Sequence, residues 1–183
     1  VEAAELADRG IVRRVDLRTG AVLASTPLAP DRFGEGLALL DGRLYQLTWE
    51  STVGYVYDAK SLARVDSFAY AGEGWGLATD GTSLIMSDGS DSLRFLSPPS
   101  MATARVVHVR YQDSPLSKIN ELEFIDGVLY ANVYESDWVA RIDPATGEVQ
   151  QLVDFSALWP RGTRPYGADV INGIARAPAP GQL

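Results

Sequence analysis

A glutamate between two glycines, Gly34-Glu35-Gly36, is the group in this sequence best suited to acid–base chemistry. Glycine has no side chain, so the carboxyl group of Glu35 is uncrowded and a ligand can approach the backbone beside it. Burial in an aromatic pocket would raise the pKa of Glu35 toward neutrality, where a carboxyl group serves as a general acid or base. A solvent-exposed glutamate in a glycine loop is the alternative, and the residues alone leave both interpretations open.

Trp75 also stands between two glycines, Gly74 and Gly76. A large aromatic side chain in such a loop is typical of a binding wall, although a residue that packs between neighbouring sheets fits the same pattern. Asn120 precedes Glu121, and its amide could polarise a carbonyl group or stabilise an oxyanion. Capping a turn is the commoner role of such an asparagine.

The composition narrows the chemistry that these residues can serve. A net charge of −8 and sixteen scattered Lys and Arg residues argue against a nucleic-acid partner or an anionic membrane surface. The absence of cysteine excludes disulfides, a thiolate nucleophile and cysteine-bound zinc. The single histidine, His108, lies in an alternating strand pattern at 106–110, which disfavours a histidine-rich zinc site and a Ser-His-Asp triad. Any chemistry must therefore use carboxylates, amides, aromatic groups or lysine.

The elements that position these residues are indicated by an internal repeat. Four segments share a short strand preceded by small or polar residues, and in three of them an Asp-Gly turn follows; they are 33–45, 74–85, 119–130 and 170–175. With Leu37, Leu77, Leu122 and Ile174 taken as equivalent, the spacings are 40, 45 and 52 residues. Periods of about 40 to 50 residues are typical of β-propeller blades.

Each repeat has the same internal order of strands and turns. The Asp-Gly pairs at 41–42, 80–81 and 126–127 predict hairpin turns with positive φ. A second strand follows at 44–49 or 128–134, a third at 53–58 or 138–143, and a fourth at 148–153. The late part of this pattern also opens the chain at 15–24. The sequence therefore predicts an all-β protein with two strands, three full blades and one further strand.

These boundaries predict one incomplete propeller domain over 1–183. The expected blade parts are roughly 9–30, 33–72, 74–115, 119–158 and 170–178. Because unclosed sheet edges expose backbone donors and acceptors, we expect further sequence, or else a second chain, to complete the ring.

In a propeller, the residues that precede the innermost strands line the central channel. Those residues are Phe33, Glu35, Gly74, Trp75, Asn120, Glu121 and Asn172. The loops after the second strands add Trp49 and Tyr134, on the same or the opposite face.

At these residues the sequence resembles the plant and bacterial glutaminyl cyclases, also called glutamine cyclotransferases. The resemblance is carried in collinear order by Phe33-Gly-Glu-Gly-Leu, Leu44-Tyr-Gln-Leu-Thr-Trp, Gly74-Trp-Gly-Leu-Ala-Thr-Asp-Gly, Ser87-Asp-Gly, Asn120-Glu-Leu-Glu-Phe, Tyr130-Ala-Asn-Val-Tyr and Asp169-Val-Ile-Asn-Gly-Ile. It implies a five-bladed propeller of which the first half of blade one and most of blade five are absent. The family's active-site lysine belongs to a Thr-Gly-Lys segment that does not occur here, so no residue can be named for it.

The resemblance implies an enzyme that cyclises an N-terminal glutamine to pyroglutamate and releases ammonia. Glu35 would be the general base and then the general acid, and Asn120 would bind the substrate carbonyl group. Phe33, Trp49 and Trp75 would form aromatic walls. Tyr134 stands where many members have tryptophan, which keeps a wall and adds a hydroxyl group.

The resemblance also implies partners and a location. The scheme requires no metal or other cofactor, and the substrates would be peptides or proteins with an N-terminal glutamine. Propeller closure favours a monomer. Apolar runs of only a few residues, far short of the roughly 20 that span a bilayer, predict a soluble protein. Family members are usually exported, which implies a periplasmic or secreted protein; no leader opens at Val1, so we expect any signal to have been removed or to lie outside this sequence.

Two other classes of protein remain open on these residues. In a calcium-dependent hydrolase of the lactonase type, Glu35, Asn120 and Asn172 would be oxygen ligands around one channel. In a non-catalytic binding propeller, Trp49 and Trp75 would grip a sugar or peptide and Glu35 would have no chemical role. Within the cyclase hypothesis, this chain alone could also be inactive, because the lysine and part of the pocket are absent.

Overall fold

The computed structural model describes residues 2–4, 10–158, 160–164 and 170–176 as an assembly of antiparallel β-sheets. The strands are β1 (Glu2–Ala4), β2 (Ile11–Val15), β3 (Val22–Pro27), β4 (Gly34–Leu40), β5 (Arg43–Thr48), β6 (Val53–Asp58), β7 (Arg64–Ala69), β8 (Leu77–Thr79), β9 (Leu84–Met86), β10 (Ser92–Ser97), β11 (Ala102–His108), β12 (Arg110–Tyr111), β13 (Ser114–Pro115), β14 (Ile119–Ile125), β15 (Val128–Val133), β16 (Trp138–Ile142) and β17 (Val149–Asp154). A short 3₁₀ helix spans Arg161–Thr163. Within the described ranges, no helix has the length and apolar character needed to cross a membrane.

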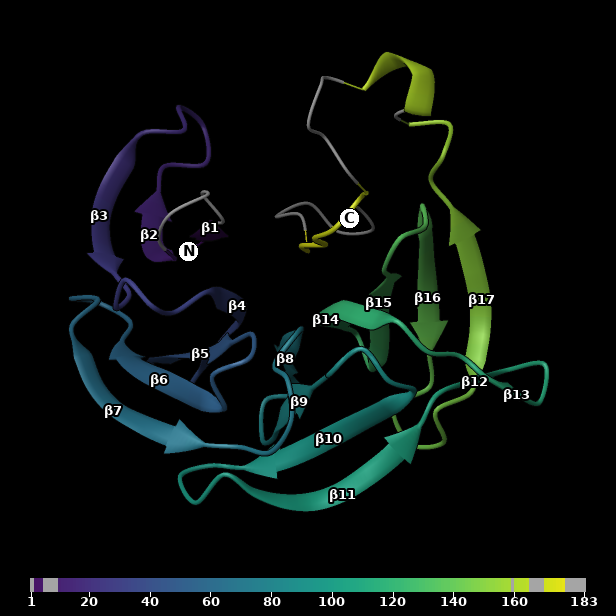
Figure 1. Ribbon diagram of the computed structural model, residues 1–183, viewed down its shortest axis with the longest axis horizontal. Helices are drawn as coiled ribbons and strands as arrows, with labels where there is room; N and C mark the ends of the chain where they lie inside the picture. The colour runs from purple at the N-terminus through teal and green to yellow at the C-terminus, as the bar shows by residue number, and fades with distance from the viewer. Residues whose placement is uncertain (1, 5–9, 159, 165–169, 177–183) are drawn as a thin grey trace.

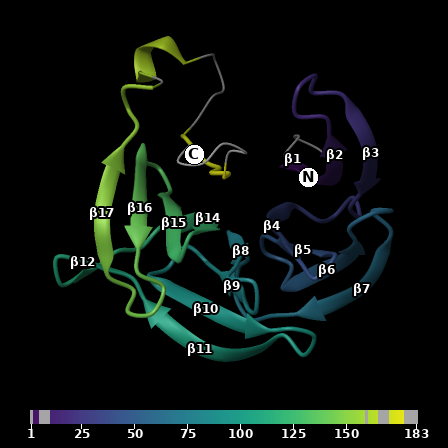
Figure 2. The ribbon, with the colours of Figure 1, turned by 180° about the vertical axis from the view of Figure 1, so that it is seen from behind.

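Three four-stranded sheets repeat one topology, in which strands adjacent in sequence are also adjacent in space. They are β4-β5-β6-β7, β8-β9-β10-β11 and β14-β15-β16-β17, and β12-β13 forms a separate hairpin between the last two. The sheets follow one another around an arc, with β4, β8 and β14 on the inner side and β7, β11 and β17 on the outer side (Figure 1, Figure 2). The predicted all-β architecture is confirmed.

The first sheet contains one strand more than predicted. β1 pairs with β2, from Glu2 opposite Arg13 to Ala4 opposite Ile11, and β2 pairs with β3. The repeat pattern predicts only two strands here. A three-residue strand carries too little alternation to be recognised from its own residues, so only its partner in the sheet identifies it.

Two of the three predicted Asp-Gly hairpins have the expected backbone geometry. Asp41 and Gly42 have φ values of 49° and 73°, and the equivalent residues at 126–127 have 49° and 84°. At the third pair only Gly81, with φ 89°, has a positive value. There the carboxylate of Asp80 accepts hydrogen bonds from the backbone N–H groups of residues 82 and 83 at 2.9 and 2.7 Å, which builds a longer loop.

The hydrophobic core lies between neighbouring sheets. Leu47 and Val56 of the β4–β7 sheet pack with Leu84 and Met86 of the β8–β11 sheet. Equivalent clusters fill the interfaces on either side of this one. Because each interface buries apolar side chains from two sheets, the spacing between the inner strands is set by core packing.

The inner strands carry matching β-bulges near their beginnings. The register of β4 against β5 shifts between Gly34 and Leu37, and that of β14 against β15 shifts between Ile119 and Leu122. A bulge removes residues from the regular ladder and redirects them. Both bulges contain candidate site residues, because 35–36 lies in the first and 120–121 in the second.

Glycine allows the inner strands to approach one another closely at these bulges. The backbone N–H of Gly36 donates to the carbonyl oxygen of Trp75 at 2.8 Å, which links the first two of the three four-stranded sheets. A Cβ atom on Gly76 would overlap the carbonyl oxygen of Asn120 and would lie 2.9 Å from Oγ of Ser87. The contact between β8 and β14 therefore requires glycine at position 76.

We expect Gly76→Ala to lower the free energy of unfolding by about 1–3 kcal/mol, the usual range for overpacking at a close contact. Gly162→Ala is the matched control, because a Cβ on Gly162 meets nothing within 4 Å and its φ is not left-handed. Urea denaturation of both variants measures the difference. Equal stability of the two variants would contradict the close approach of the inner strands.

Residues 170–176 form no strand, although the fourth repeat predicts one there. Side chains of the neighbouring sheet bind their backbone instead. Nδ2 of Asn132 donates to the carbonyl oxygen of Ile171 at 3.1 Å, and Oδ1 of Asn132 accepts from the N–H of Gly173 at 3.0 Å. The segment is thus docked on the sheet without a ladder of its own. Residues 9, 177 and 178 of the predicted blade parts, and residue 169 of the family motif, lie outside the described residues.

Candidate active site

The structure brings the predicted site residues to one end of the strands. Glu35 and Asn120 lie in the bulges of β4 and β14, and Trp75 lies just before β8. The N–H of Trp49, which follows β5, donates to the carbonyl oxygen of Phe33 at 3.1 Å. The equivalent bond of Tyr134, after β15, runs to the carbonyl oxygen of residue 118 at 2.8 Å. The loops after the second strands therefore open on the same face as the beginnings of the inner strands.

Glu35 is half-buried and lies within β4 rather than in a fully exposed glycine loop. Tyr70, which follows β7, lies close enough to Glu35 to interact with its charge. Burial raises the pKa of Tyr70, and the nearby charge of Glu35 adds to the rise. The phenol is held by Thr48: its O–H donates a hydrogen bond to the carbonyl oxygen of Thr48, and it accepts one from the N–H of Thr48 at 3.0 Å. Sequence reasoning missed Tyr70, which no repeat or motif singled out.

The backbone of Asn120 is fixed by a hydrogen bond, whereas its side-chain amide is available to the candidate site. Its side chain is buried, with 7% of the residue exposed, yet its amide makes no hydrogen bond to any described residue. Its carbonyl oxygen accepts from Oγ of Ser87 at 2.7 Å, and the same Oγ accepts from the N–H of Gly76 at 2.8 Å. The amide of Asn120 therefore caps no turn among the described residues, which leaves it available to a bound molecule.

Four aromatic residues form two edge-to-face pairs. The ring centroids of Phe33 and Trp49 are 6.0 Å apart, and those of Trp75 and Tyr134 are 5.5 Å apart. Phe33 and Trp49 remain 39% and 41% exposed, which leaves ring surface for a ligand. Trp75 packs over Gly89, where a Cβ atom would lie 2.6 Å from the indole ring. All four predicted wall residues thus lie at the end of the sheets that carries Glu35 and Asn120.

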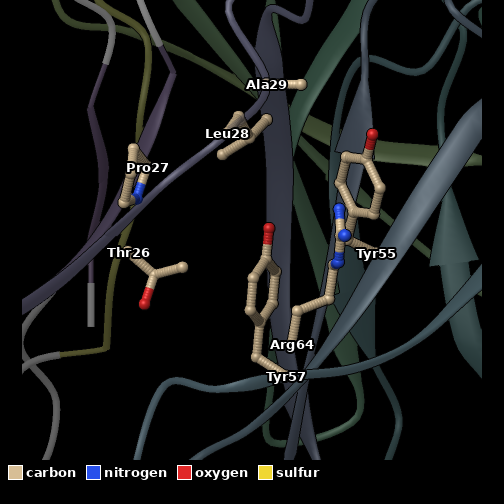
Figure 3. A pocket seen from close by; sticks show the side chains of 7 residues that line it. All are labelled: Thr26, Pro27, Leu28, Ala29, Tyr55, Tyr57 and Arg64. Carbon is tan, nitrogen blue, oxygen red and sulfur yellow. The ribbon is translucent and has the colours of Figure 1, made fainter.

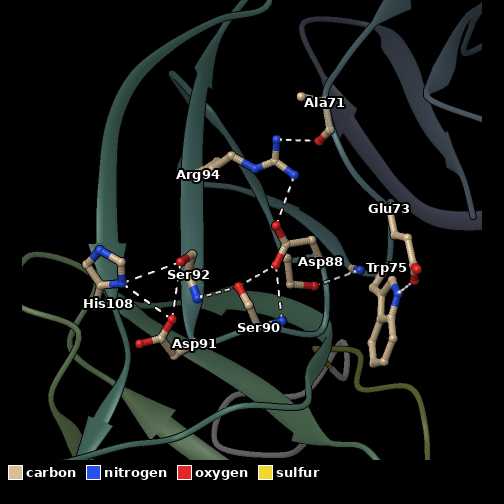
Figure 4. A network of polar contacts seen from close by, with 11 residues as sticks. Ala71, Glu73, Trp75, Asp88, Ser90, Asp91, Ser92, Arg94 and His108 are labelled. Atoms are coloured by element: carbon tan, nitrogen blue, oxygen red, sulfur yellow. Dashed lines mark hydrogen bonds and ion pairs between the residues drawn. The ribbon is translucent and has the colours of Figure 1, made fainter. Parts of the chain in front are cut away.

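Glu73 lies among the candidate site residues, although the sequence analysis did not single it out. Its Oε2 atom accepts a hydrogen bond from the indole N–H of Trp49 at 2.9 Å. The same atom accepts a second hydrogen bond from the indole N–H of Trp75 at 2.8 Å, which Figure 4 shows. The signal was present, because Gly72-Glu73-Gly74 repeats the Gly-Glu-Gly pattern around Glu35. What the sequence could not show is that two tryptophans from different sheets meet at this carboxylate.

Glu121 is the carboxyl group in the β14 bulge, at the position that Gly36 and Gly76 occupy in the other sheets. Its Oε2 atom accepts the N–H of Ile174 at 2.9 Å, which ties the last described segment to the sheet. Burial raises the pKa of Glu121 to about 8, against the lowering effect of that hydrogen bond. Glu121 is therefore protonated at pH values where an exposed glutamate is charged.

This raised pKa predicts a pH-dependent stability. Between its usual pKa of 4.5 and about 8, Glu121 keeps a proton in the folded protein that the unfolded chain has released. Its contribution to the free energy of unfolding therefore falls as the pH rises, by up to about 1.4 kcal/mol per pH unit. Glu121→Gln keeps a carbonyl acceptor for Ile174 and removes the titration. We expect its Tm to exceed that of the unaltered protein by a margin that grows from pH 5 to pH 8.

Thermal melts at several pH values measure this margin, and Glu50→Gln serves as the control. Glu50 is exposed and makes no hydrogen bond or ion pair with the described residues, so its substitution controls for the removal of one carboxyl group outside the bulge. A constant margin for Glu121→Gln would contradict the protonation of Glu121 in the folded state.

His108 ends β11 and is exposed, which confirms its predicted place on a strand (Figure 4). Its Nδ1 atom lies 3.4 Å from Oδ1 of Asp91 and 3.4 Å from Oγ of Ser92. A catalytic triad uses the two ring nitrogens for two different partners, so this cluster is not one. In the part of the chain that the structure describes, no three His, Cys, Asp or Glu side chains form a group that could hold a metal ion.

A hollow of about 430 Å³ lies elsewhere, between β3 and the β6–β7 hairpin (Figure 3). It is lined by Thr26, Pro27, Leu28, Ala29, Tyr55, Tyr57 and Arg64. Arg64 begins β7, whereas the candidate site adjoins the opposite end of this sheet, where Val53 pairs with Ala69. None of the predicted site residues lines the hollow, so the candidate active site is the face that carries Glu35.

Solved structures share this arrangement of sheets. The crystal structure of the glutaminyl cyclase from Myxococcus xanthus matches 81% of this chain and 64% of its own, with a TM-score of 0.76 and 40% sequence identity. The hydrazine synthase from Kuenenia stuttgartiensis matches 79% of this chain and 42% of its own, with a TM-score of 0.53, and at 18% identity it shows a shared fold alone. The fold therefore places the chain in the class of all-β proteins that includes the glutaminyl cyclase.

Sequence comparison narrows this class to one family. The family model for glutamine cyclotransferase matches residues 1–183, and the chain belongs to that family. A curated relative, the glutaminyl-peptide cyclotransferase of Arabidopsis thaliana, is 40% identical over 178 residues, which are 95% of this chain and 55% of the relative. The resemblance seen in the sequence motifs is confirmed. The chain spans less than two thirds of the length of either glutaminyl cyclase.

Proposed function

We propose that the protein containing this chain is a glutaminyl-peptide cyclotransferase, which converts an N-terminal glutamine to pyroglutamate and releases ammonia. One observation carries the proposal: Glu35 and Asn120 occupy equivalent positions in two bulges at one end of the sheets, and four aromatic side chains lie at the same end. Family membership and the names of the 40% identical relatives support it.

Glu35 would move the proton that the reaction must transfer. The α-amine nitrogen of the substrate attacks its own side-chain carbonyl carbon, and a new C–N bond closes the five-membered ring. Glu35 accepts a proton from the attacking amine and then donates it to the side-chain amide nitrogen. The C–N bond to that nitrogen breaks, ammonia leaves, and Glu35 returns to its starting charge. One carboxyl group can therefore act in turn as base and acid.

Asn120 and the aromatic walls would bind the substrate around Glu35. The side-chain amide of Asn120, which no described residue engages, can donate to the carbonyl oxygen as negative charge develops on it. Phe33, Trp49, Trp75 and Tyr134 would enclose the aliphatic part of the glutamine and exclude water from the reacting atoms.

We further propose that the sheets are blades of a five-bladed propeller whose remaining strands, and the family's active-site lysine, lie outside these 183 residues. The repeated four-stranded topology around an arc supports this reading (Figure 1). By family resemblance the protein would be a periplasmic or secreted monomer that acts on peptides with an N-terminal glutamine, without a metal or other cofactor.

The test is ammonia release by the full-length protein from a peptide with an N-terminal glutamine, with the cyclised product detected by mass spectrometry. The same peptide with an acetylated α-amine is the control, because it lacks the nucleophile. We expect turnover of the first peptide only, unchanged by a metal chelator. A chelator that abolishes activity would favour the calcium-dependent class, and binding of the peptide without turnover would favour a binding propeller.

A further inference from the structure

One carboxylate oxygen joins the two tryptophan walls of the candidate site. Oε2 of Glu73 accepts from Nε1 of Trp49 at 2.9 Å and from Nε1 of Trp75 at 2.8 Å. Trp49 follows β5 and Trp75 precedes β8, so the two indoles belong to neighbouring four-stranded sheets. The indole N–H is a donor only, and hydrogen bonds to a charged acceptor are among the stronger ones. A single atom thus orients both rings.

The backbone around Glu73 is tied to the same place. The N–H of Gly74 donates to the carbonyl oxygen of Trp49 at 3.0 Å, so Trp49 contacts this segment through both its main chain and its indole. A Cβ atom on Gly74 would lie 2.6 Å from the phenolic oxygen of Tyr70 and 2.9 Å from Cβ of Leu47. Glycine is therefore needed here for the segment to come close enough for Glu73 to reach the indole of Trp49.

Charge pairing does not account for the position of Glu73. It is exposed, and none of the described Lys, Arg or His residues forms an ion pair with it. An exposed carboxylate is well solvated by water, so its placement between two indoles has its main effect on the indoles. Trp49 meets Phe33 edge-on and Trp75 meets Tyr134 edge-on, which extends the effect to all four aromatic rings.

We propose that Glu73 is a positioning residue that sets the relative orientation of Trp49 and Trp75, so that the aromatic side chains of two sheets form one substrate wall. Glu73 would not touch the reacting atoms, and its contribution would be to substrate binding. The structural part of this inference stands on the hydrogen bonds alone, whereas its kinetic part rests on the proposed cyclotransferase function.

The structural part is tested by NMR of the indole N–H groups in the full-length protein, with resonances assigned from Trp49→Phe and Trp75→Phe variants. We expect Glu73→Ala to move both resonances, because both lose their acceptor. Glu73→Gln keeps a carbonyl oxygen and should move them less. Glu50→Ala, next to Trp49 and without a hydrogen bond to the described residues, is the control for loss of a negative charge and should leave the Trp75 resonance in place.

The kinetic part is tested by ammonia release. For Glu73→Ala we expect KM to rise by about 3- to 10-fold while kcat changes by less than about twofold, since a binding wall is weakened and the chemical step is not. Glu73→Gln should recover part of the loss, and Glu50→Ala should match the unaltered protein. A purely structural role would not produce this split between KM and kcat or this partial rescue.

The outcomes separate this inference from the proposed function. We call the arrangement in which Glu73 holds the indoles of Trp49 and Trp75 the clamp. If neither indole resonance moves in Glu73→Ala, the clamp is wrong whatever the activity. If both move but KM does not, the clamp exists and its role in substrate binding is overturned. A fall in kcat at unchanged KM would place Glu73 in the chemical step and overturn the positioning role. Absence of turnover in the unaltered protein would remove the proposed function, and the NMR result would still decide the clamp.

Discussion

Glu35→Gln is expected to lower kcat for ammonia release by about 10²- to 10⁴-fold, the usual contribution of a general acid–base group. The substitution keeps the size of the side chain and one acceptor oxygen, and it removes the ability to exchange a proton. Because Glu35 lies half-buried in a bulge between two glycines, its replacement leaves the inner strand in place. KM should change little, since the aromatic walls come from other residues.

The matched comparison is Glu73→Gln, which makes the same chemical change in the same Gly-Glu-Gly setting. Only the substitution at 35 should remove turnover, while the substitution at 73 should act on KM. Steady-state kinetics and a peptide-binding titration of both variants distinguish the two effects. Full ammonia release by Glu35→Gln would end the proposed mechanism, and equal losses at both positions would mean that a negative charge near the walls, rather than proton transfer, matters.

Asn120→Ala is expected to lower kcat by about 10²- to 10³-fold, the usual effect of removing one donor to a developing oxyanion. Asn120→Asp should be at least as damaging, because it replaces the amide donor with negative charge beside the oxyanion. The backbone of Asn120 is held by Ser87 through its carbonyl oxygen, which neither substitution alters.

The free energy of unfolding distinguishes a role of Asn120 in the reaction from a role in the fold. Since the amide of Asn120 makes no hydrogen bond to the described residues, its removal should change the free energy of unfolding by less than about 1 kcal/mol. Loss of turnover with an unchanged urea midpoint is the expected pair of results. A large loss of stability together with a proportionate loss of activity would show that Asn120 supports the fold rather than the reaction.

Local patterns predicted much of the architecture. The hairpins at 41–42 and 126–127 follow from the backbone freedom of Asp-Gly, and the alternation after them predicts the second and third strands. The hairpin at 80–81 departs from the prediction because the carboxylate of Asp80 forms a competing turn. The strand predicted at 170–176 is absent from the described residues, where side chains of the neighbouring sheet bind the backbone.

The Gly-Glu-Gly motif around Glu35 illustrates what the sequence by itself determined and what it did not. Residue type and repeat position singled out Glu35, Asn120 and the aromatic residues, because these properties are local. The second Gly-Glu-Gly, around Glu73, has the same composition, and its role depends on two tryptophans 24 and 2 residues away. Only the packing of neighbouring sheets brings those indoles to one oxygen atom, because core side chains between the sheets set the distance that the carboxylate spans.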